Sequence, residues 1–280
     1  MRLALGISYL GTAYRGWQSQ PNAATAQDAV EAALSRFVGD SLPLRTICAG
    51  RTDSGVHALN QVVHLDTDID RRDISWVRGC NRYLPIDIAI QWCNRVPDDF
   101  HARFHARGRR YVYLLLESAV RPAIESGRVG WVFRPLDDAP MREAAAMLIG
   151  QHDFSAFRSS ECQALSPVKQ MREITIGRHG QYWRFDFEAN AFLHHMVRNL
   201  MGCLIAVGSG SRRPSWVADV LAAKDRSLAA PTFAPDGLYF VGPQYDAALG
   251  LPTHTAAMDG LPGASPAAPA LTSERPLTNP

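Results

Sequence analysis

The sequence has almost no lysine, because only Lys169 and Lys224 occur among its 29 basic residues and all the others are arginine. Arginine presents a planar set of donors that suits phosphate oxygens, and its flat face can stack on bases. A genome-wide bias towards arginine would give the same composition, so the scarcity of lysine identifies no partner. The formal net charge of +2 is also uninformative, because local clustering can matter more than the total.

The sequence also lacks paired cysteines and long apolar runs. Its five cysteines are scattered over 280 residues without any C-x-x-C pair, which argues against a disulfide framework and a zinc knuckle. The longest apolar stretch, residues 200–207, is far below the roughly 20 residues of a membrane span. The N-terminus becomes polar too early for a signal peptide. We therefore expect a soluble, cytoplasmic protein with free thiols.

Aromatic residues are absent from the end of the chain. After Tyr245 the last 35 residues contain none, and they carry six of the 18 prolines. Such a segment buries too little apolar surface to offset the entropy of ordering it. We predict a disordered tail over residues 246–280.

The remaining sequence predicts alternating strands and helices in two similar halves. The expected helices cover residues 25–37, 74–83, 140–149, 191–207 and 215–223, and the expected strands cover residues 3–10, 44–49, 61–65, 86–93, 111–116, 171–178, 182–188 and 237–241. The pattern loosens over residues 121–132 and then starts again. We predict an α/β (α+β) fold with halves at residues 1–105 and 106–245, each a mixed sheet backed by helices.

A polar loop with Asp53 near its centre is the most informative segment. It reads AGRTDSGVHA over residues 49–58, between two expected apolar strands, and glycines bracket the Asp. Glycines permit tight turns and close approach of another backbone. A carboxylate displayed there can act as a nucleophile or as a general base. A turn Asp that caps its own loop is the alternative.

Residues 100–113 are rich in arginine and aromatic residues and contain no acidic residue. Cations for phosphates and rings for unstacked bases are what looped RNA requires, so we expect RNA contacts here, among them from Arg109 and Arg110. An edge strand with core-facing aromatics is the alternative. His101 and His105 share a helical spacing, but the extended pattern and the positive neighbours argue against a metal site.

Residues 191–202 predict an amphipathic helix from which Arg198 projects away from the apolar stripe. Arg198 is either a solvated surface residue or a partner that orients an active-site carboxylate and keeps it ionised. The helix pattern alone leaves both readings open.

Six motifs occur together in one order along the chain. They are GTAYRGWQSQP (residues 11–21), GRTDSGVH (50–57), RRY (109–111), GQHDF (150–154), HHMVRN (194–199) and GLY (237–239). In this combination the chain resembles the tRNA pseudouridine synthase A family over residues 3–245. A single GRTD would be weak evidence, whereas six ordered motifs are specific.

The resemblance implies a role for each matched residue. Asp53 matches the catalytic aspartate, and Arg51 matches the arginine thought to evict the target base. Tyr111 matches the tyrosine that packs on the flipped uracil, and Arg198 matches the arginine paired with the carboxylate. We also expect substrate contacts from two further motif residues, His57 and Leu238.

The resemblance further implies an isomerase that converts uridine to pseudouridine in the anticodon stem-loop of tRNA, at positions 38, 39 and 40. It implies the pseudouridine synthase fold with a central basic cleft, a homodimer, and no metal or organic cofactor. Ser54, Asn60 and His105 depart from residues frequent in the family. None of these departures falls on a matched site residue.

Three other classes of protein remain as alternatives at this point. An RNA-binding protein or chaperone would need the basic, aromatic surface but not Asp53. A metal-dependent hydrolase would need a ligand cluster that the sequence does not offer. A glycosidase-like enzyme usually pairs two carboxylates, and no second acid lies near Asp53 in sequence.

Overall fold

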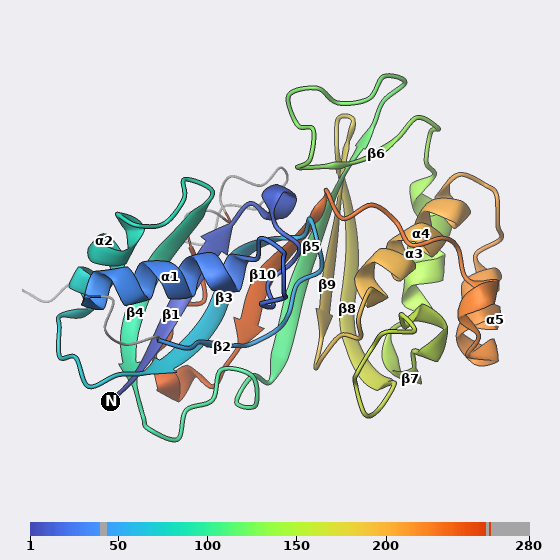
Figure 1. Ribbon diagram of the computed structural model, residues 1–280. Helices are drawn as coiled ribbons and strands as arrows, with labels where there is room; N and C mark the ends of the chain where they lie inside the picture. The colour runs from blue at the N-terminus through green and yellow to red at the C-terminus, as the bar shows by residue number, and fades with distance from the viewer. Residues whose placement is uncertain (40–43, 256–257, 259–280) are drawn as a thin grey trace, which may run out of the picture.

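A computed structural model describes residues 1–39, 44–255 and 258, and it contains one large mixed sheet with five α-helices in these residues (Figure 1). The strands are β1 (Arg2–Tyr9), β2 (Ile47–Cys48), β3 (His57–Asp66), β4 (Ile88–Val96), β5 (Gly108–Glu117), β6 (Gly130–Val132), β7 (Gly150–Asp153), β8 (Val168–His179), β9 (Tyr182–Ala189) and β10 (Leu238–Gln244). The α-helices are α1 (Ala26–Val38), α2 (Asp73–Asn81), α3 (Asp138–Ala146), α4 (Met196–Gly208) and α5 (Ser215–Ala223). Short 3₁₀ helices are η1 (Gly11–Ala13), η2 (Ser155–Phe157), η3 (Arg226–Leu228) and η4 (Ala247–Leu249).

The last strand of the chain lies in the middle of the sheet. The strand order is β4-β1-β3-β10-β5-β9-β8-β7, with β2 paired to β3 and β6 paired to β5. β10 runs parallel to β3 and antiparallel to β5. Its backbone thus pairs with one edge of each of these strands, which would otherwise be left without hydrogen bonds. We expected a separate sheet in each half, but β10 joins the strands into a single sheet.

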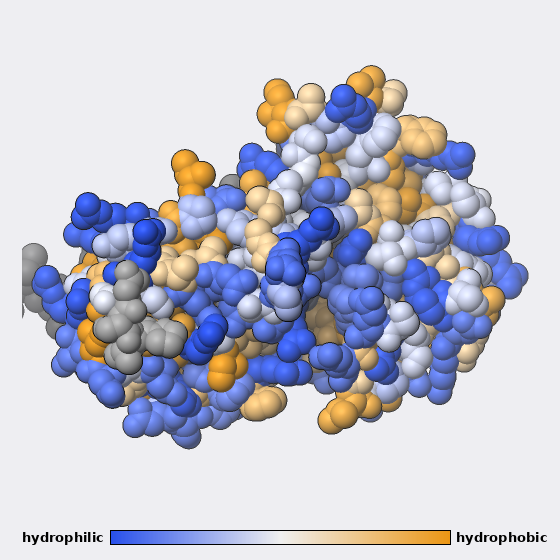
Figure 2. All heavy atoms as spheres, viewed as in Figure 1, coloured by the Kyte–Doolittle hydropathy of each residue, from blue (hydrophilic) through white to orange (hydrophobic). Residues whose placement is uncertain are grey.

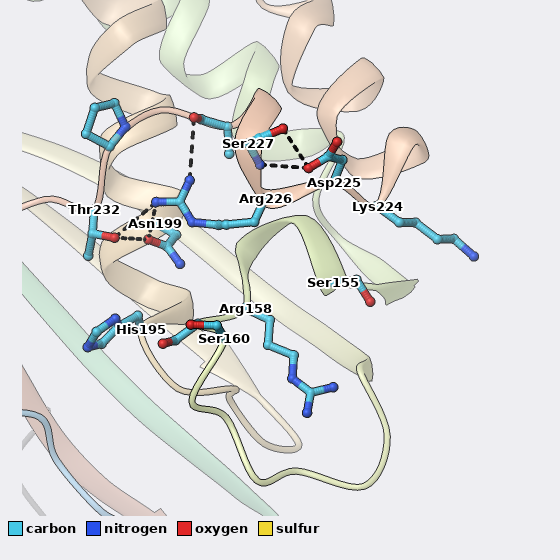
Figure 3. A pocket seen from close by; sticks show the side chains of 13 residues that line it. Ser155, Arg158, Ser160, His195, Asn199, Lys224, Asp225, Arg226, Ser227 and Thr232 are labelled. Atoms are coloured by element: carbon cyan, nitrogen blue, oxygen red, sulfur yellow. Dashed lines mark hydrogen bonds between the residues drawn. The ribbon is translucent and has the colours of Figure 1, made fainter.

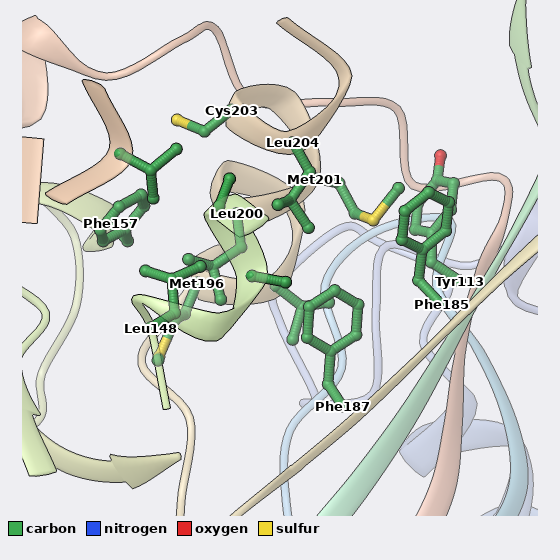
Figure 4. Close-up of a cluster of buried hydrophobic side chains, with 14 of the residues drawn as sticks. Tyr113, Leu148, Phe157, Phe185, Phe187, Met196, Leu200, Met201, Cys203 and Leu204 are labelled. Carbon is green, nitrogen blue, oxygen red and sulfur yellow. The ribbon is translucent and has the colours of Figure 1, made fainter. Parts of the chain in front are cut away.

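Alternating side chains of the strands build the core that positions the later part of the chain. Along β9 every second residue is buried, including Phe185 and Phe187. These rings belong to the same buried cluster as Leu200 and Leu204 of α4 (Figure 4). Because α4 is buried against the sheet on this face, the first turn of the helix has a fixed position.

The strands of the first part of the chain pack against α1 and α2. Leu3 and Leu5 of β1 share a buried cluster with Val30 of α1 and Trp76 of α2. The predicted N-cap of α1 is confirmed, because the side chain of Thr25 accepts a hydrogen bond from a backbone N–H in the first turn of the helix.

α4 begins later than the sequence pattern predicted. We expected a helix from residue 191, whereas the helix starts at Met196. His195 has φ +62°, in the left-handed region, which an α-helix of L-residues cannot include. The chain therefore turns at His195, and the first helical turn contains Arg198.

The prediction of a disordered tail is wrong for residues 246–255. Leu249 and Leu251 pack against a buried cluster on the sheet. The side chain of Asn60 donates to the carbonyl oxygen of Pro252 at 3.2 Å, and Thr255 donates to a carbonyl oxygen of β3 at 3.1 Å. These contacts with a preformed sheet offset the entropy of ordering the segment, which composition cannot reveal. Residues 256–257 and 259–280 lie outside the described residues.

No α-helix in the described residues has both the length and the apolar character needed to cross a lipid bilayer.

Candidate active site

The loop that carries Asp53 is held in place by the residues that follow β1. The backbone N–H of Trp17 donates to the carbonyl oxygen of Thr52 at 3.1 Å, and Gly55 N–H donates to the carbonyl oxygen of Tyr14 at 3.2 Å. Gly55 has φ +80°, a conformation that favours glycine and that the turn after Asp53 requires. The motif at residues 11–21 thus supports the motif at residues 50–57.

Gly16 allows the two loops to come this close. Its φ is +86°, and a Cβ atom built on it would lie 2.6 Å from the carbonyl oxygen of Thr52. Below the loop the hydroxyl groups of Tyr9 and Thr52 are hydrogen-bonded at 2.7 Å. Asp53 therefore sits on a rigid base rather than on a free loop.

Three cationic or polar side chains from the start of α4 surround the Asp53 carboxylate. His194 Nε2 lies 3.3 Å from Oδ1, and Arg198 Nη1 lies 3.3 Å from Oδ2. His195 Nε2 lies 3.6 Å from Oδ2. Arg198 is oriented by a second bond, because its Nε donates to the carbonyl oxygen of Phe233 at 2.9 Å. Residues about 140 positions apart thus form one cluster.

The cluster keeps the carboxylate ionised although it is only 16% exposed. Burial raises the pKa of Asp53, but the hydrogen bond from His194 and the charges of both histidines and of Arg198 outweigh burial and hold this pKa below its ordinary value. The same hydrogen bond raises the pKa of His194. Burial lowers the pKa of His195 despite the nearby carboxylate. The pKa values of the two adjacent histidines are therefore shifted in opposite directions.

Tyr111 lies on β5 and presents its ring near the same carboxylate. The ring packs 5.0 Å from the ring of Phe192 and 5.0 Å from that of Phe240. Burial, and next the charge of Asp53, raise the pKa of Tyr111 well above its ordinary value. The phenol is therefore neutral at physiological pH and can donate a hydrogen bond or stack on a base.

Arg51 is the exposed cationic side chain of the Asp53 loop. Its Nη1 donates to the side-chain oxygen of Gln163 at 3.3 Å, so this loop reaches a loop of the later part of the chain. This contact is exposed and single, and an incoming ligand can replace it at small cost.

We expected Arg109 to contact the substrate, but its guanidinium forms hydrogen bonds within the protein. It donates to the carbonyl oxygens of Ala49 at 3.1 Å, Arg103 at 2.8 Å and Asn190 at 2.9 Å. Ala49 begins the Asp53 loop, so Arg109 ties that loop to β5. The neighbouring Arg110 is half-buried, and its Nε has no hydrogen-bond partner in the described structure.

His57 and Leu238 are both buried beside the site. His57 Nδ1 accepts from Gly11 N–H at 2.9 Å, and its Nε2 lies 2.8 Å from the carbonyl oxygen of Asp236. Both ring nitrogens are thus occupied, and burial lowers the pKa of His57. Leu238 begins β10 and packs in the core that contains α4. His57 links three segments, and neither side chain is exposed.

Asp53, His194 and His195 also have the composition of a metal-ligand set. One ligand atom from each lies within 4.8 Å of the other two. However, Arg198 Nη1 is only 3.3 Å from a carboxylate oxygen of the same set. A guanidinium at this distance repels a divalent cation, so the donor set suits an ion-pair cluster better than a metal site.

Sequence reasoning assigned no role to His194 and His195. Both belong to the HHMVRN motif, three and four residues before Arg198. The available signal was their position at the expected start of a helix, beside an arginine already considered as a partner for the carboxylate. The left-handed turn at His195 could not be read from that signal.

Comparison with known proteins identifies the family of the chain. A family model described as tRNA pseudouridine synthase matches residues 6–105 and 144–246, which include Asp53 and Arg198. The chain belongs to this family. It is 73% identical over 262 residues to tRNA pseudouridine synthase A of Methylibium petroleiphilum, covering 94% of this chain and all of the relative. It is also 61% identical over 266 residues to tRNA pseudouridine synthase A of Polaromonas naphthalenivorans, with the same coverage.

Proposed function

We propose that the chain converts uridine to pseudouridine in the anticodon stem-loop of tRNA, at positions 38, 39 and 40, with Asp53 as the catalytic carboxylate. The observation that carries this proposal is the cluster of Asp53 with Arg198 and His194 at 3.3 Å, in a protein of the tRNA pseudouridine synthase family. A buried carboxylate kept ionised in this way is ready for nucleophilic or general-base chemistry.

The reaction needs no atom that substrate and water do not supply. The bond between C1′ and N1 breaks, the uracil turns, and C1′ bonds to C5; C5 then loses a proton and N1 gains one. Asp53 attacks C1′ or removes a sugar proton to give a glycal. Both routes need the ionised form, which Arg198 and His194 favour.

The uridine must leave its stack before the base can turn, which costs a few kcal/mol. Arg51 is assigned to this step because its side chain is exposed and, within the described residues, forms a hydrogen bond only with Gln163. When Arg51 exchanges this contact for RNA, its planar guanidinium can fill the vacated space in the stack.

Tyr111 is assigned to hold the plane of the flipped uracil. Its ring is fixed between Phe192 and Phe240, which supports a single orientation. Arg109 and His57, whose donors and acceptors are occupied by backbone groups, are assigned to position the Asp53 loop. Leu238 supports α4 from the core. We assign a phosphate contact to Arg110, whose Nε has no hydrogen-bond partner in the described residues.

We further propose two halves, residues 1–105 and 106–245, around a central basic cleft that straddles the RNA, and a homodimer. A cleft is supported by the hollow near the middle of the face in Figure 2, around which hydrophilic side chains gather. The homodimer follows from the family resemblance, and analytical ultracentrifugation of the purified protein tests it.

The assignment of Asp53 predicts that Asp53→Asn binds tRNA as the wild type does but loses at least about a thousandfold in turnover. The amide keeps the shape of the side chain but cannot act as a nucleophile or base. Tritium release from tRNA labelled at uridine C5 measures turnover, and filter binding measures affinity.

Asp68→Asn is the matched control, because Asp68 is an exposed carboxylate that forms no ion pair with any of the described residues. It should release tritium at the wild-type rate. Normal release from Asp53→Asn would overturn the assignment. If the wild-type protein itself released no tritium from any tRNA, the proposed function would fail.

A further inference from the structure

A large cavity lies beside His195 of the Asp53 cluster and has no role in the chemistry described above. Its volume is about 810 Å³, and its walls come from η2, the loop after η2, the start of α4 and residues 224–232 (Figure 3). His195 belongs both to this wall and to the surroundings of Asp53, since its Nε2 is 3.6 Å from Oδ2 of that residue. The cavity therefore borders the reaction site at His195.

The wall is rich in hydrogen-bond donors and poor in free acids. It contains five hydroxyl side chains, Ser155, Ser159, Ser160, Ser227 and Thr232, and three cationic ones, Arg158, Lys224 and Arg226. The acidic side chain in the described lining, Asp225, accepts hydrogen bonds from the backbone N–H and the hydroxyl of Ser227 at 2.8 and 2.7 Å. One oxygen of that carboxylate, Oδ1, thus caps η3.

The three cations differ in how firmly the protein holds them. Arg226 donates to Asn199 Oδ1 at 3.1 Å and to Thr232 Oγ1 at 3.0 Å, so its guanidinium belongs to the wall. Arg158 donates to backbone carbonyl oxygens, of which that of Ala164 is at 3.1 Å. These acceptors are neutral, and no carboxylate of the described residues pairs with Arg158, so its charge adds a positive potential to the cavity.

Lys224 is the most available of the three. Its side chain is 58% exposed, and its single ion pair is to Asp153 Oδ2 at 3.2 Å. An exposed pair of this kind contributes little stability, so a stronger anion can replace Asp153. Lys224 ends α5 with φ +56°, an uncommon conformation for a residue with a side chain. In Figure 3 Lys224 and Arg158 extend away from the Arg226 network.

We propose that this cavity binds the RNA backbone phosphates next to the target uridine, with Lys224 as the principal contact and Arg158 as a second cation. This inference rests on the proposed function, because the Asp53 site must hold one nucleotide of the same strand. Hydroxyl groups and cations are side chains that bind phosphate oxygens, and the carboxylate paired with Lys224, Asp153, can be replaced by a stronger anion. The cavity thereby fixes the register of the strand while Asp53 acts on one base.

The test compares Lys224→Gln with Arg213→Gln. Arg213 lies just before α5, as Lys224 lies just after it, and it also has an exposed ion pair at 3.2 Å, to Asp219. Lys224→Gln should raise KM for tRNA about fivefold with kcat nearly unchanged, and should lower the slope of log affinity against log salt by about 0.7 to 0.9. Arg213→Gln should change neither quantity, and Lys224→Arg should restore both.

A substrate with neutral methylphosphonate linkages flanking the target uridine isolates the phosphate. With this RNA the wild type and Lys224→Gln should have the same KM, because the charge that Lys224 recognises is absent. An equal loss with charged and neutral RNA would overturn the proposal, as would equal KM values for Lys224→Gln and wild type on normal tRNA. In both cases wild-type tritium release would still support the proposed function.

Discussion

At the scale of single residues, the active site depends on the ionisation of one carboxylate. Asp53 is largely buried, and burial alone would favour its neutral form. The hydrogen bond from His194 is the first of the interactions that reverse this preference, ahead of the charge of Arg198. The arginine that the motif drew attention to is therefore one partner among three, and His194 is a positioning residue for the carboxylate.

His194→Gln should shift the acid limb of the pH–rate profile to higher pH. Loss of the His194 hydrogen bond and charge raises the pKa of Asp53, since burial remains. Activity requires ionised Asp53, so it falls as pH decreases through that pKa, and the fall begins at a higher pH in the variant. Initial rates of tritium release from acid to neutral pH measure the shift.

His179→Gln serves as the control, because His179 is an exposed residue at the end of β8. Its acid limb should coincide with that of the wild type. If the His194→Gln profile also coincided with the wild type, with only its height reduced, His194 would have no influence on the ionisation of Asp53.

At the scale of elements, most helices and strands follow from local patterns. α5 begins and ends where the apolar pattern predicted, and α1 begins after the predicted cap, Thr25. Both depend on side chains within one or two turns of each other. α4 was predicted too long because the left-handed turn at His195 serves the site and not the helix. The short β7 was missed because Gly150–Asp153 has no alternating apolar pattern.

The contact between the Gly16 and Asp53 loops predicts that Gly16→Ala is more damaging than an ordinary glycine replacement. A methyl group there has both the strain of a positive φ and a clash with the Thr52 carbonyl oxygen at 2.6 Å. The strain alone costs about 1 to 2 kcal/mol. We expect a larger loss of unfolding free energy, and at least about a tenfold loss of turnover as the Asp53 loop shifts.

Gly210→Ala separates strain from the clash, since Gly210 has φ +71° and no heavy atom within 4 Å of an added Cβ. Urea denaturation and tritium release measure the two effects. Gly210→Ala should lose about 1 kcal/mol and keep its turnover. Equal turnover in the two variants would mean that the loop contact does not position Asp53.

At the scale of the whole molecule, β10 joins strands from both parts of the chain. The strands of residues 2–96 lie on one side of β10, and those of residues 108–189 lie on the other. The Asp53 loop precedes β3, and Tyr111 lies on β5, so β10 separates the two strands that carry these residues. The stability of this sheet therefore bears directly on the geometry of the site.

Buried histidines make that stability depend on pH. His64 lies within β3, is 3% exposed, and accepts a hydrogen bond from Ala102 N–H at 3.2 Å. Burial, with the charges of Arg2 and His101, lowers the pKa of His64 to about 4. In the unfolded chain the pKa of His64 is about 6.5. As pH falls from this value to about 4, the unfolded chain binds a proton at His64 and the folded chain does not. The free energy of unfolding should therefore fall by about 2 to 3 kcal/mol as pH decreases through this range.

Urea denaturation at a series of pH values measures this dependence. His64→Asn should reduce the free energy of unfolding at neutral pH but lose less of it on acidification, because the group that takes up the proton is absent. His179→Asn, at an exposed histidine, should keep the wild-type dependence. Parallel curves for His64→Asn and wild type would contradict the assignment.

Periodicity, caps and glycine-bracketed loops are encoded by neighbouring residues, so the amino-acid sequence predicts most helices and strands and the Asp53 loop. The contacts between distant segments emerge only from the folded protein. Folding brought His194 to Asp53 across 141 positions, directed Arg109 to backbone carbonyls, and placed β10 between β3 and β5. Such contacts depend on how distant segments pack, and no local pattern in a single sequence records that packing.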